Sequence, residues 1–190
     1  MSKRSRIWRD FIKRGRPGSL ARVVEELVAR AEAAELRNRL LGSDVVLVPT
    51  PRSAPLRPGT LWPSRMICDE LLEKGLAAAI HPCLKRVKAV RKSAFAARGE
   101  RPTTHDHAAS MLATPGLLPP KRLLLVDDFV TKGATLLAGA SLLSAAFPDV
   151  EVQCFALVRT MGLVPNVDRI VAPCLGSLRL TESGEVDRTP

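Results

Sequence analysis

The stretch LLLVDDFVTKGAT, residues 123–135, decides the fold that the sequence predicts. Four apolar residues indicate a buried strand, two aspartates follow, and a glycine precedes a long apolar segment with the length of a helix. In a sheet of parallel strands, ligands bind beyond the carboxyl ends of the strands. The stretch therefore predicts that Asp127 and Asp128 face a ligand at the edge of such a sheet.

Strand and helix patterns alternate on both sides of this stretch. The strands are predicted over residues 44–49, 76–87, 121–128 and 150–160, with short ones over 168–173 and 177–183. The helices are predicted over residues 19–42, 64–75 and 134–147, with a short one that Thr104 can cap. This alternation is typical of an α/β fold, a mostly parallel sheet with helices on both faces.

Length and composition predict a single domain. The chain has 190 residues, of which 46% are hydrophobic, enough for one substantial core. We expect a basic arm and helical extension over 1–42, a core over 43–175 and a tail over 176–190, with the two ends forming a small hood. No apolar run reaches the roughly 18 residues of a membrane helix, and the basic start lacks the apolar centre of a signal peptide. A soluble, cytoplasmic protein without membrane contact is expected.

The cysteines and the charges narrow the functional classes. Four cysteines lie far apart without a C-x-x-C spacing, which favours reduced core thiols over a zinc site or a disulfide framework. The net charge is +10, with basic runs in the first sixteen residues and over 84–101. The basic arm could bind nucleic acid or an acidic partner, or could be a solvated face. Trp8 and Phe11 could stack on bases, although such aromatics more often pack into a core.

The chemistry of residues 127–135 indicates a ribose phosphate. Carboxylates at a strand end can accept hydrogen bonds from sugar hydroxyls or hold a hydrated magnesium ion. The start of the following helix offers backbone N–H groups to an anion, and Thr131 and Thr135 add hydroxyls. Gly133 would let the backbone approach the anion closely. A ligand with a ribose diol and a 5-phosphate would satisfy both halves of this motif.

At these residues the chain resembles the type I phosphoribosyltransferases, whose signature is an apolar strand, two acidic residues, a short variable stretch and a Thr/Ser-Gly-Thr-like turn. A weaker similarity extends over roughly residues 44–160 and includes VLVPTPRSAPLRPG, residues 46–59. Within the family, the chain is most similar to the competence-associated, amidophosphoribosyltransferase-like proteins. It departs from them at its amino end, where a basic helical segment replaces their cysteine-bound zinc module.

The resemblance implies a glycosyltransferase of nucleotide metabolism that binds phosphoribosyl pyrophosphate with Mg²⁺ and transfers the phosphoribosyl group to or from a nitrogen nucleophile. Asp127 and Asp128 would bind the ribose hydroxyls, and the metal through water or ribose. The 5-phosphate would be held by Thr131, Lys132, Gly133, Ala134 and Thr135. The residues facing pyrophosphate would be Thr50, Pro51, Arg52, Ser53, Lys85, Arg86 and Lys88. Residues 88–103 would form a mobile loop that closes over the ligand, and a homodimer is expected.

Other interpretations stay open. A domain of the same fold could bind a ribose phosphate or nucleotide as a sensor without catalysis, and a nucleic-acid-binding accessory protein could use the basic arm. Phosphoacceptor receivers are disfavoured because their acidic pair lies near the chain start, and nucleotide hydrolases because no G-x-x-x-x-G-K-[ST] loop is present. His105 and His107 could bind a metal or act as a base, but their spacing is poor for a metal on a helix. A helix-capping surface segment is the favoured interpretation of these two histidines.

Overall fold

The computed structural model describes residue 12 and residues 18–29, 34–91, 101–116, 121–160 and 173–189. Several of the sequence predictions concern residues outside these ranges. The basic arm apart from Ile12, residues 92–100 of the predicted loop and residues 168–172 of a predicted strand lie outside the described residues. Ile12 itself is buried in the core beside Leu20 and Val24.

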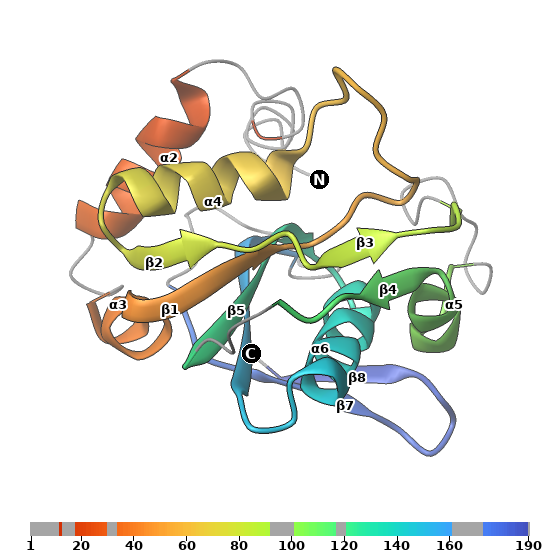
Figure 1. The fold of residues 1–190 in the computed structure, drawn as a ribbon. Helices are drawn as coiled ribbons and strands as arrows, with labels where there is room; N and C mark the ends of the chain where they lie inside the picture. The colour runs from red at the N-terminus through yellow and green to blue at the C-terminus, as the bar shows by residue number, and fades with distance from the viewer. Residues whose placement is uncertain are drawn as a thin grey trace.

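A parallel sheet forms the centre of the molecule (Figure 1). It contains four strands in the order β2-β1-β5-β6. Their bounds are β1 Gly42–Pro49, β2 Ala77–Ile80, β5 Arg122–Val130 and β6 Glu151–Arg159. The chain runs outward from β1 to β2 and then returns to the other side of β1 to form β5 and β6. The strand order therefore reverses between β1 and β5, which is where open α/β sheets bind ligands.

Helices cover both faces of this sheet, which confirms the predicted α/β class. On one face α4, Pro63–Glu73, lies against β1 and β5, and α2, Ser19–Ala29, packs on α4. The other face carries α6, Ala134–Ala146, which contacts β5 and β6. Beside α6 lie α5, Thr104–Ala109, and an antiparallel ribbon of β3, Leu84–Arg86, with β4, Met111–Ala113 (Figure 1).

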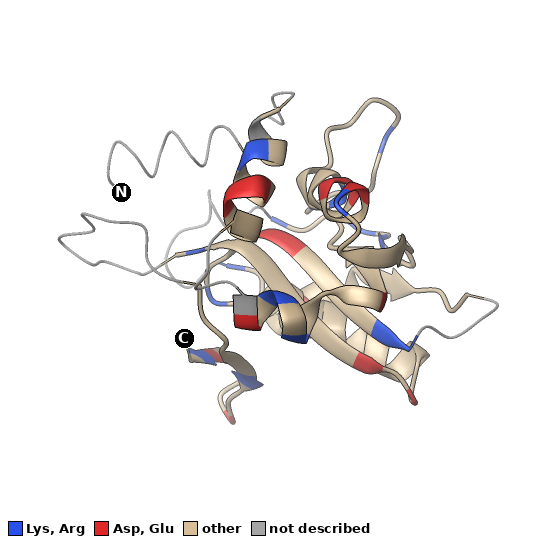
Figure 2. Cartoon of the chain, turned by 90° about the vertical axis from the view of Figure 1, so that its left-hand side faces the viewer, with Lys and Arg blue, Asp and Glu red and all other residues tan. Residues whose placement is uncertain are grey.

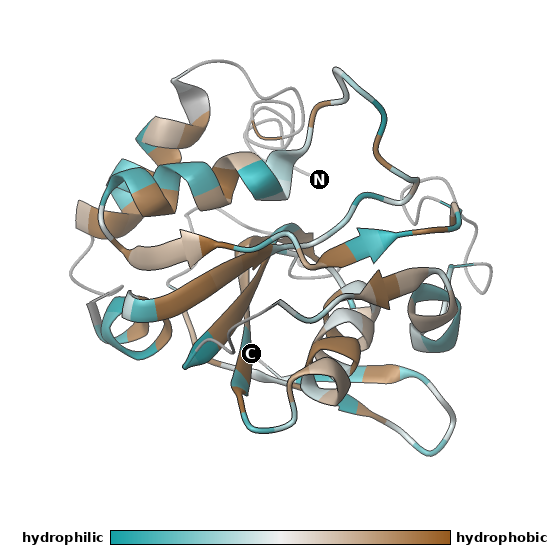
Figure 3. Cartoon of the chain, in the orientation of Figure 1, coloured by the Kyte–Doolittle hydropathy of each residue, from teal (hydrophilic) through white to brown (hydrophobic). Residues whose placement is uncertain are grey.

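The two central strands supply the core. They are among the most apolar segments of the chain (Figure 3). Leu124 and Val126 belong to the core cluster beneath α4, while Leu123 and Leu125 belong to the cluster beneath α6. Successive strand residues face opposite sides, so β5 fills both layers, and each fully buried leucine contributes roughly 1.5–3 kcal/mol.

Charged residues are placed mainly on helices, loops and the ends of strands (Figure 2). At the amino ends of β1 and β5, Arg122 makes a two-pronged ion pair with Asp44, with nitrogen–oxygen distances of 2.8 and 2.9 Å. No described helix has the length and apolar character needed to cross a membrane.

Several predicted boundaries differ from the structure. The segment predicted as one helix over 19–42 contains α2 and a separate α3, Ala34–Leu40. The strand predicted over 76–87 is divided into β2 and β3, because Pro82 cannot donate a ladder hydrogen bond in a continuous strand. The short strand β4 was not predicted. In the tail, β7, Ser177–Leu180, pairs with an unpredicted β8, Val186–Thr189, to form a hairpin.

Candidate functional site

The carboxyl ends of β1 and β5 meet beside the start of the 50–53 loop. Pro49 pairs with Val126, and the N–H of Thr50 donates to the Val126 carbonyl at 2.8 Å. The Thr50 carbonyl accepts hydrogen bonds from Trp62 Nε1 at 2.8 Å and from Ser64 Oγ at 2.6 Å. These bonds tie the loop to the start of α4, so its first residue has a fixed place next to the two aspartates.

The two aspartates lie within β5 rather than at its end. The strand was predicted to end at residue 128, but it continues to Val130, where it pairs with Arg159 of β6. Pairing with β1 ends earlier, at Val126. The aspartates are therefore flanked by β6 on one side and by the departing 50–53 loop on the other.

Local hydrogen bonds orient both carboxylates. Asp127 Oδ1 accepts the N–H of Asp128, and Asp128 Oδ1 accepts the N–H of Phe129, both at 2.9 Å. Asp128 is buried and Asp127 is half-buried. Each carboxylate therefore has one oxygen engaged by the backbone of the next residue, an arrangement that restricts the rotation of the side chain.

Arg86 is the buried cation of the site. The residue is only 6% exposed, and its Nε donates to the Arg52 carbonyl at 2.8 Å. Its Nη1 donates to Ser110 Oγ and, at 3.4 Å, to the His107 carbonyl. Burial lowers the pKa of Arg86 to about 10, while the negative charge of Asp127 acts in the opposite direction. Arg86 stays charged at neutral pH and braces the 50–53 loop.

The other cations predicted to face pyrophosphate are placed differently. Lys85 is exposed and precedes Arg86 on β3, so strand alternation directs it to the opposite face. Lys88 is exposed, and its N–H bonds to the Ser110 carbonyl at 3.3 Å. The Arg52 guanidinium donates to the Leu61 carbonyl, in the segment that connects β1 to α4. Only Arg86 among these four is a buried cation, a distinction that composition alone cannot make.

The structure corrects the interpretation of His107. Thr103, rather than Thr104, caps α5 through a capping box with Asp106, and His105 is exposed as a surface segment would require. His107 is instead 5% exposed. Its Nδ1 lies 3.4 Å from Arg86 Nη2 and its Nε2 lies 3.2 Å from Thr135 Oγ1. The 3.6-residue helical period separates residues two apart onto different faces, which explains the two environments.

Burial keeps His107 neutral. Removal from water is the main cause that lowers the pKa of His107 to about 4; the positive charge of Arg86 acts in the same direction, and Asp106 opposes the shift. The folded protein therefore binds fewer protons at this residue than the unfolded chain between roughly pH 6.5 and 4.

Acidification is expected to destabilise the protein through His107. The free energy of unfolding is not reduced by His107 above about pH 6.5. As the pH falls from there toward 4, the unfolded chain gains a proton that buried His107 does not bind, and the free energy of unfolding falls by up to about 3 kcal/mol. Urea unfolding of the wild type and of His107→Gln across this range measures it, since the variant should lose less stability on acidification. The control is His105→Gln, which removes the exposed histidine of the same helix. Equal pH profiles for His107→Gln and the wild type would refute the prediction.

The 131–135 turn connects β5 to α6. Thr131 and Lys132 are exposed, Gly133 has a left-handed backbone with φ +97°, and α6 begins at Ala134. The first backbone N–H groups of a helix lack partners within the helix and attract anions. Only Phe129 and Val130, the last two residues of β5, separate this turn from the aspartates in the sequence.

The tail hairpin packs on this turn. A Cβ atom added to Gly133 would lie 2.5 Å from Leu178 Cδ2 of β7, and Lys132 forms a 3.4 Å ion pair with Glu185. From the sequence, Gly133 was expected to let the backbone approach a phosphate closely. In the structure, the missing side chain makes room for the hairpin.

Gly133→Val is expected to lower the free energy of unfolding by about 2–4 kcal/mol, because a β-branched residue is strained at positive φ and collides with Leu178. Chemical denaturation measures this. Gly75→Val is the matched control, since Gly75 has φ +68° and no atom within 4 Å of an added Cβ. Adding Leu178→Ala to Gly133→Val should restore part of the loss. Equal losses at Gly133 and Gly75 would show that the hairpin does not press on the turn.

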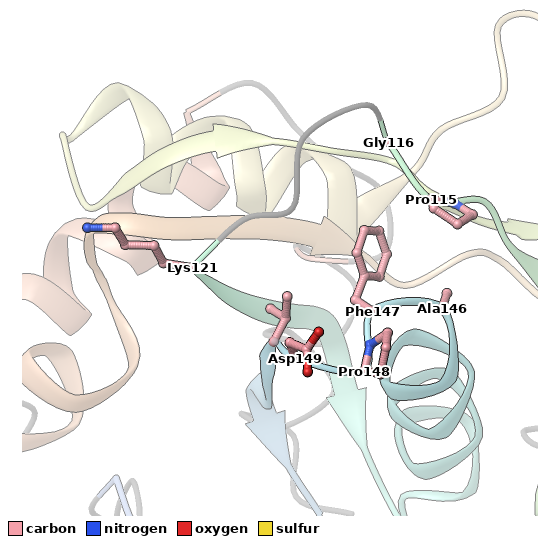
Figure 4. Close-up of a pocket in the computed structure, with 8 residues that line it drawn as sticks. Pro115, Gly116, Lys121, Ala146, Phe147, Pro148 and Asp149 are labelled. Atoms are coloured by element: carbon pink, nitrogen blue, oxygen red, sulfur yellow. The ribbon is translucent and has the colours of Figure 1, made fainter.

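A surface hollow lies at the other edge of the sheet (Figure 4). Its volume is about 410 Å³, and it is lined by residues that include Lys121, Phe147 and Asp149. Lys121 precedes β5 and Asp149 precedes β6, so the hollow borders the amino ends of these strands. It is separate from the aspartates, which lie toward the carboxyl ends.

The side chains of the site that could bind a metal ion offer oxygen atoms as ligands. Within the described ranges, no group of three or more His, Cys, Asp or Glu side chains is arranged to hold a metal ion. Asp127 and Asp128 could supply one or two oxygen ligands, which suits a hard cation that takes its remaining ligands from a phosphate and from water.

Comparisons with protein-family models, curated proteins and solved structures found no match.

Proposed function

We propose that the protein binds phosphoribosyl pyrophosphate together with Mg²⁺ and acts as a type I phosphoribosyltransferase-like enzyme on a nitrogen nucleophile. The arrangement at the junction of β1 and β5 is the main support for this proposal. There, two carboxylates, the start of a helix and a loop braced by a buried arginine meet at the point where the strand order reverses.

The carboxylates suit the ribose. Ionised Asp127 and Asp128 accept hydrogen bonds and cannot donate them, so neighbouring sugar hydroxyls are natural partners. Their backbone hydrogen bonds at 2.9 Å hold one oxygen of each side chain and so limit the reorganisation needed on binding. A diol bound by this pair would direct its 5-phosphate toward the adjoining turn.

The start of α6 suits the 5-phosphate. Backbone N–H groups at the first turn of a helix point outward, and the helix dipole adds partial positive charge there. Thr135 lies in this first turn and contributes a hydroxyl. The exposed Lys132 can add positive charge, although its ammonium group is paired with Glu185 in this structure.

The 50–53 loop suits the pyrophosphate. Asp127 lies close enough to Arg86 for its negative charge to raise the pKa of the Arg86 guanidinium, and Arg86 Nε donates to the Arg52 carbonyl. Displacement of pyrophosphate increases the negative charge on the leaving group and the positive character of the ribose ring. Magnesium held by Asp127, Asp128 and ligand oxygens would neutralise part of the negative charge when bound. Arg86 would add a fixed positive charge in a region shielded from water.

Calorimetric titration of the wild type with phosphoribosyl pyrophosphate and MgCl₂ tests binding. The complex is then incubated with a panel of nucleobases and amines while released pyrophosphate is measured. We expect saturable binding that requires the 5-phosphate, and pyrophosphate release with one class of nitrogen nucleophile. Binding without release by any nucleophile would favour the ribose-phosphate sensor. Absence of binding would refute the proposed function.

A further inference from the structure

Three side chains form a continuous connection between the 50–53 loop and the first turn of α6. Arg86 donates to the Arg52 carbonyl at 2.8 Å and places Nη2 3.4 Å from His107 Nδ1. On the opposite side of the imidazole ring, Nε2 lies 3.2 Å from Thr135 Oγ1. His107 thus lies between the proposed pyrophosphate side and the proposed 5-phosphate side of the site.

We infer that His107 is a positioning residue for the ligand phosphate, which fixes the Thr135 hydroxyl so that its hydrogen is directed to an anion at the start of α6. This inference rests on the proposed function. It assigns to His107 no contact with the ligand, and Thr135 is the group through which it acts.

The neighbours of His107 determine where its proton lies. A guanidinium group has only donors, so the ring nitrogen that faces Arg86 must accept, and Nδ1 carries the lone pair. In a neutral imidazole the proton is then on Nε2, which donates to Thr135 Oγ1. His107 and Arg86 are both buried, so water competes little for these bonds.

The assigned tautomer has a consequence for Thr135. Its hydroxyl oxygen accepts from His107, so the hydroxyl hydrogen is available to donate elsewhere. A phosphate is acceptor-only at its ionised oxygens, and a hydrogen bond to a charged group is stronger than one between neutral groups. A preoriented donor also avoids part of the entropy cost of ordering a free hydroxyl.

Nitrogen NMR of the whole protein labelled at histidine tests the proton assignment without a substitution. The expected result at pH 7.5 is a neutral His107 ring with its proton on Nε2, identified by comparison with spectra of His107→Gln. A ring protonated on Nδ1 would overturn the inference, because Nε2 would then accept from Thr135 and withdraw its hydrogen from the ligand.

Binding measurements with two substitutions test the role in recognition. The Asn in His107→Asn can keep an acceptor near the Nδ1 position for Arg86, but it is too short to reach Thr135. The Gln in His107→Gln can place an amide N–H near the Nε2 position. The probes are ribose 5-phosphate and pyrophosphate, each titrated with MgCl₂. His107→Asn should weaken ribose 5-phosphate binding about 10-fold and pyrophosphate binding less than about 2-fold, and His107→Gln should recover much of the loss.

A double-mutant cycle with Thr135→Val separates positioning from general structural support. If His107 acts through the hydroxyl, adding His107→Asn to Thr135→Val should weaken ribose 5-phosphate binding by less than about 2-fold more. Additive losses, or equal losses for both probes, would overturn the inference while leaving the proposed function standing. A wild type that binds neither ribose 5-phosphate nor phosphoribosyl pyrophosphate would instead remove both. Thermal unfolding of each variant confirms that folded proteins are compared.

Discussion

The double substitution Asp127→Asn with Asp128→Asn is expected to weaken binding of phosphoribosyl pyrophosphate with Mg²⁺ by a factor on the order of 100 or more, because two charged acceptors are lost. Folding should be kept. The amide oxygen of asparagine can still accept the N–H bonds that Asp128 and Phe129 now donate at 2.9 Å. Calorimetry measures the affinity, and thermal unfolding measures the stability.

The control for this pair is Asp149→Asn, which removes an exposed carboxylate at the amino end of β6. It should leave ligand affinity within about 2-fold of the wild type. If the double variant fails to fold, the aspartates support the strand end rather than a ligand. If it folds and binds with unchanged affinity, the ligand is held elsewhere.

Arg86→Leu is expected to lower the free energy of unfolding by about 3 kcal/mol. It leaves the Arg52 carbonyl and Ser110 Oγ without the donor that now satisfies them. Ligand affinity should also fall, since the 50–53 loop loses its brace and the site loses its buried positive charge. Urea unfolding and calorimetry measure the two effects separately.

Two further variants make the Arg86 experiment specific. Lys85→Leu removes a neighbouring exposed cation and should change stability by less than about 0.5 kcal/mol. Arg86→Lys keeps the charge but cannot reproduce a planar fork with several donors, so it should recover only part of the loss. Similar stability for Arg86→Leu and Lys85→Leu would show that the buried hydrogen bonds of Arg86 contribute little.

The sequence predicted the central part of the fold because its signals there are local. The apolar run before Asp127 and the apolar segment after Gly133 define β5 and α6, and the structure places α6 over Ala134–Ala146 as predicted to within one residue. The capping residues, by contrast, were assigned one position too late at α5. Cap geometry depends on a single turn, where Thr103 and Thr104 offer identical side chains.

The connections across the site could not be predicted from the sequence, because they depend on which distant segments meet. Arg86 and Lys85 are adjacent basic residues in one run, and only tertiary packing places one inside and the other outside. His107 resembles a surface residue in sequence because it follows charged and polar neighbours. Its burial arises where α5 packs on α6, 28 residues further along the chain at Thr135.

The pairing of β1 with β5 also has a kinetic meaning. It joins segments that are far apart in sequence, and the Asp44–Arg122 ion pair spans 78 residues. Closing so long a loop costs entropy before its contacts form, so we expect this pairing to form late in folding. The candidate site lies across the same junction, so it is absent until that step is complete. A ligand of this site would therefore prolong the lifetime of the native state without accelerating its formation.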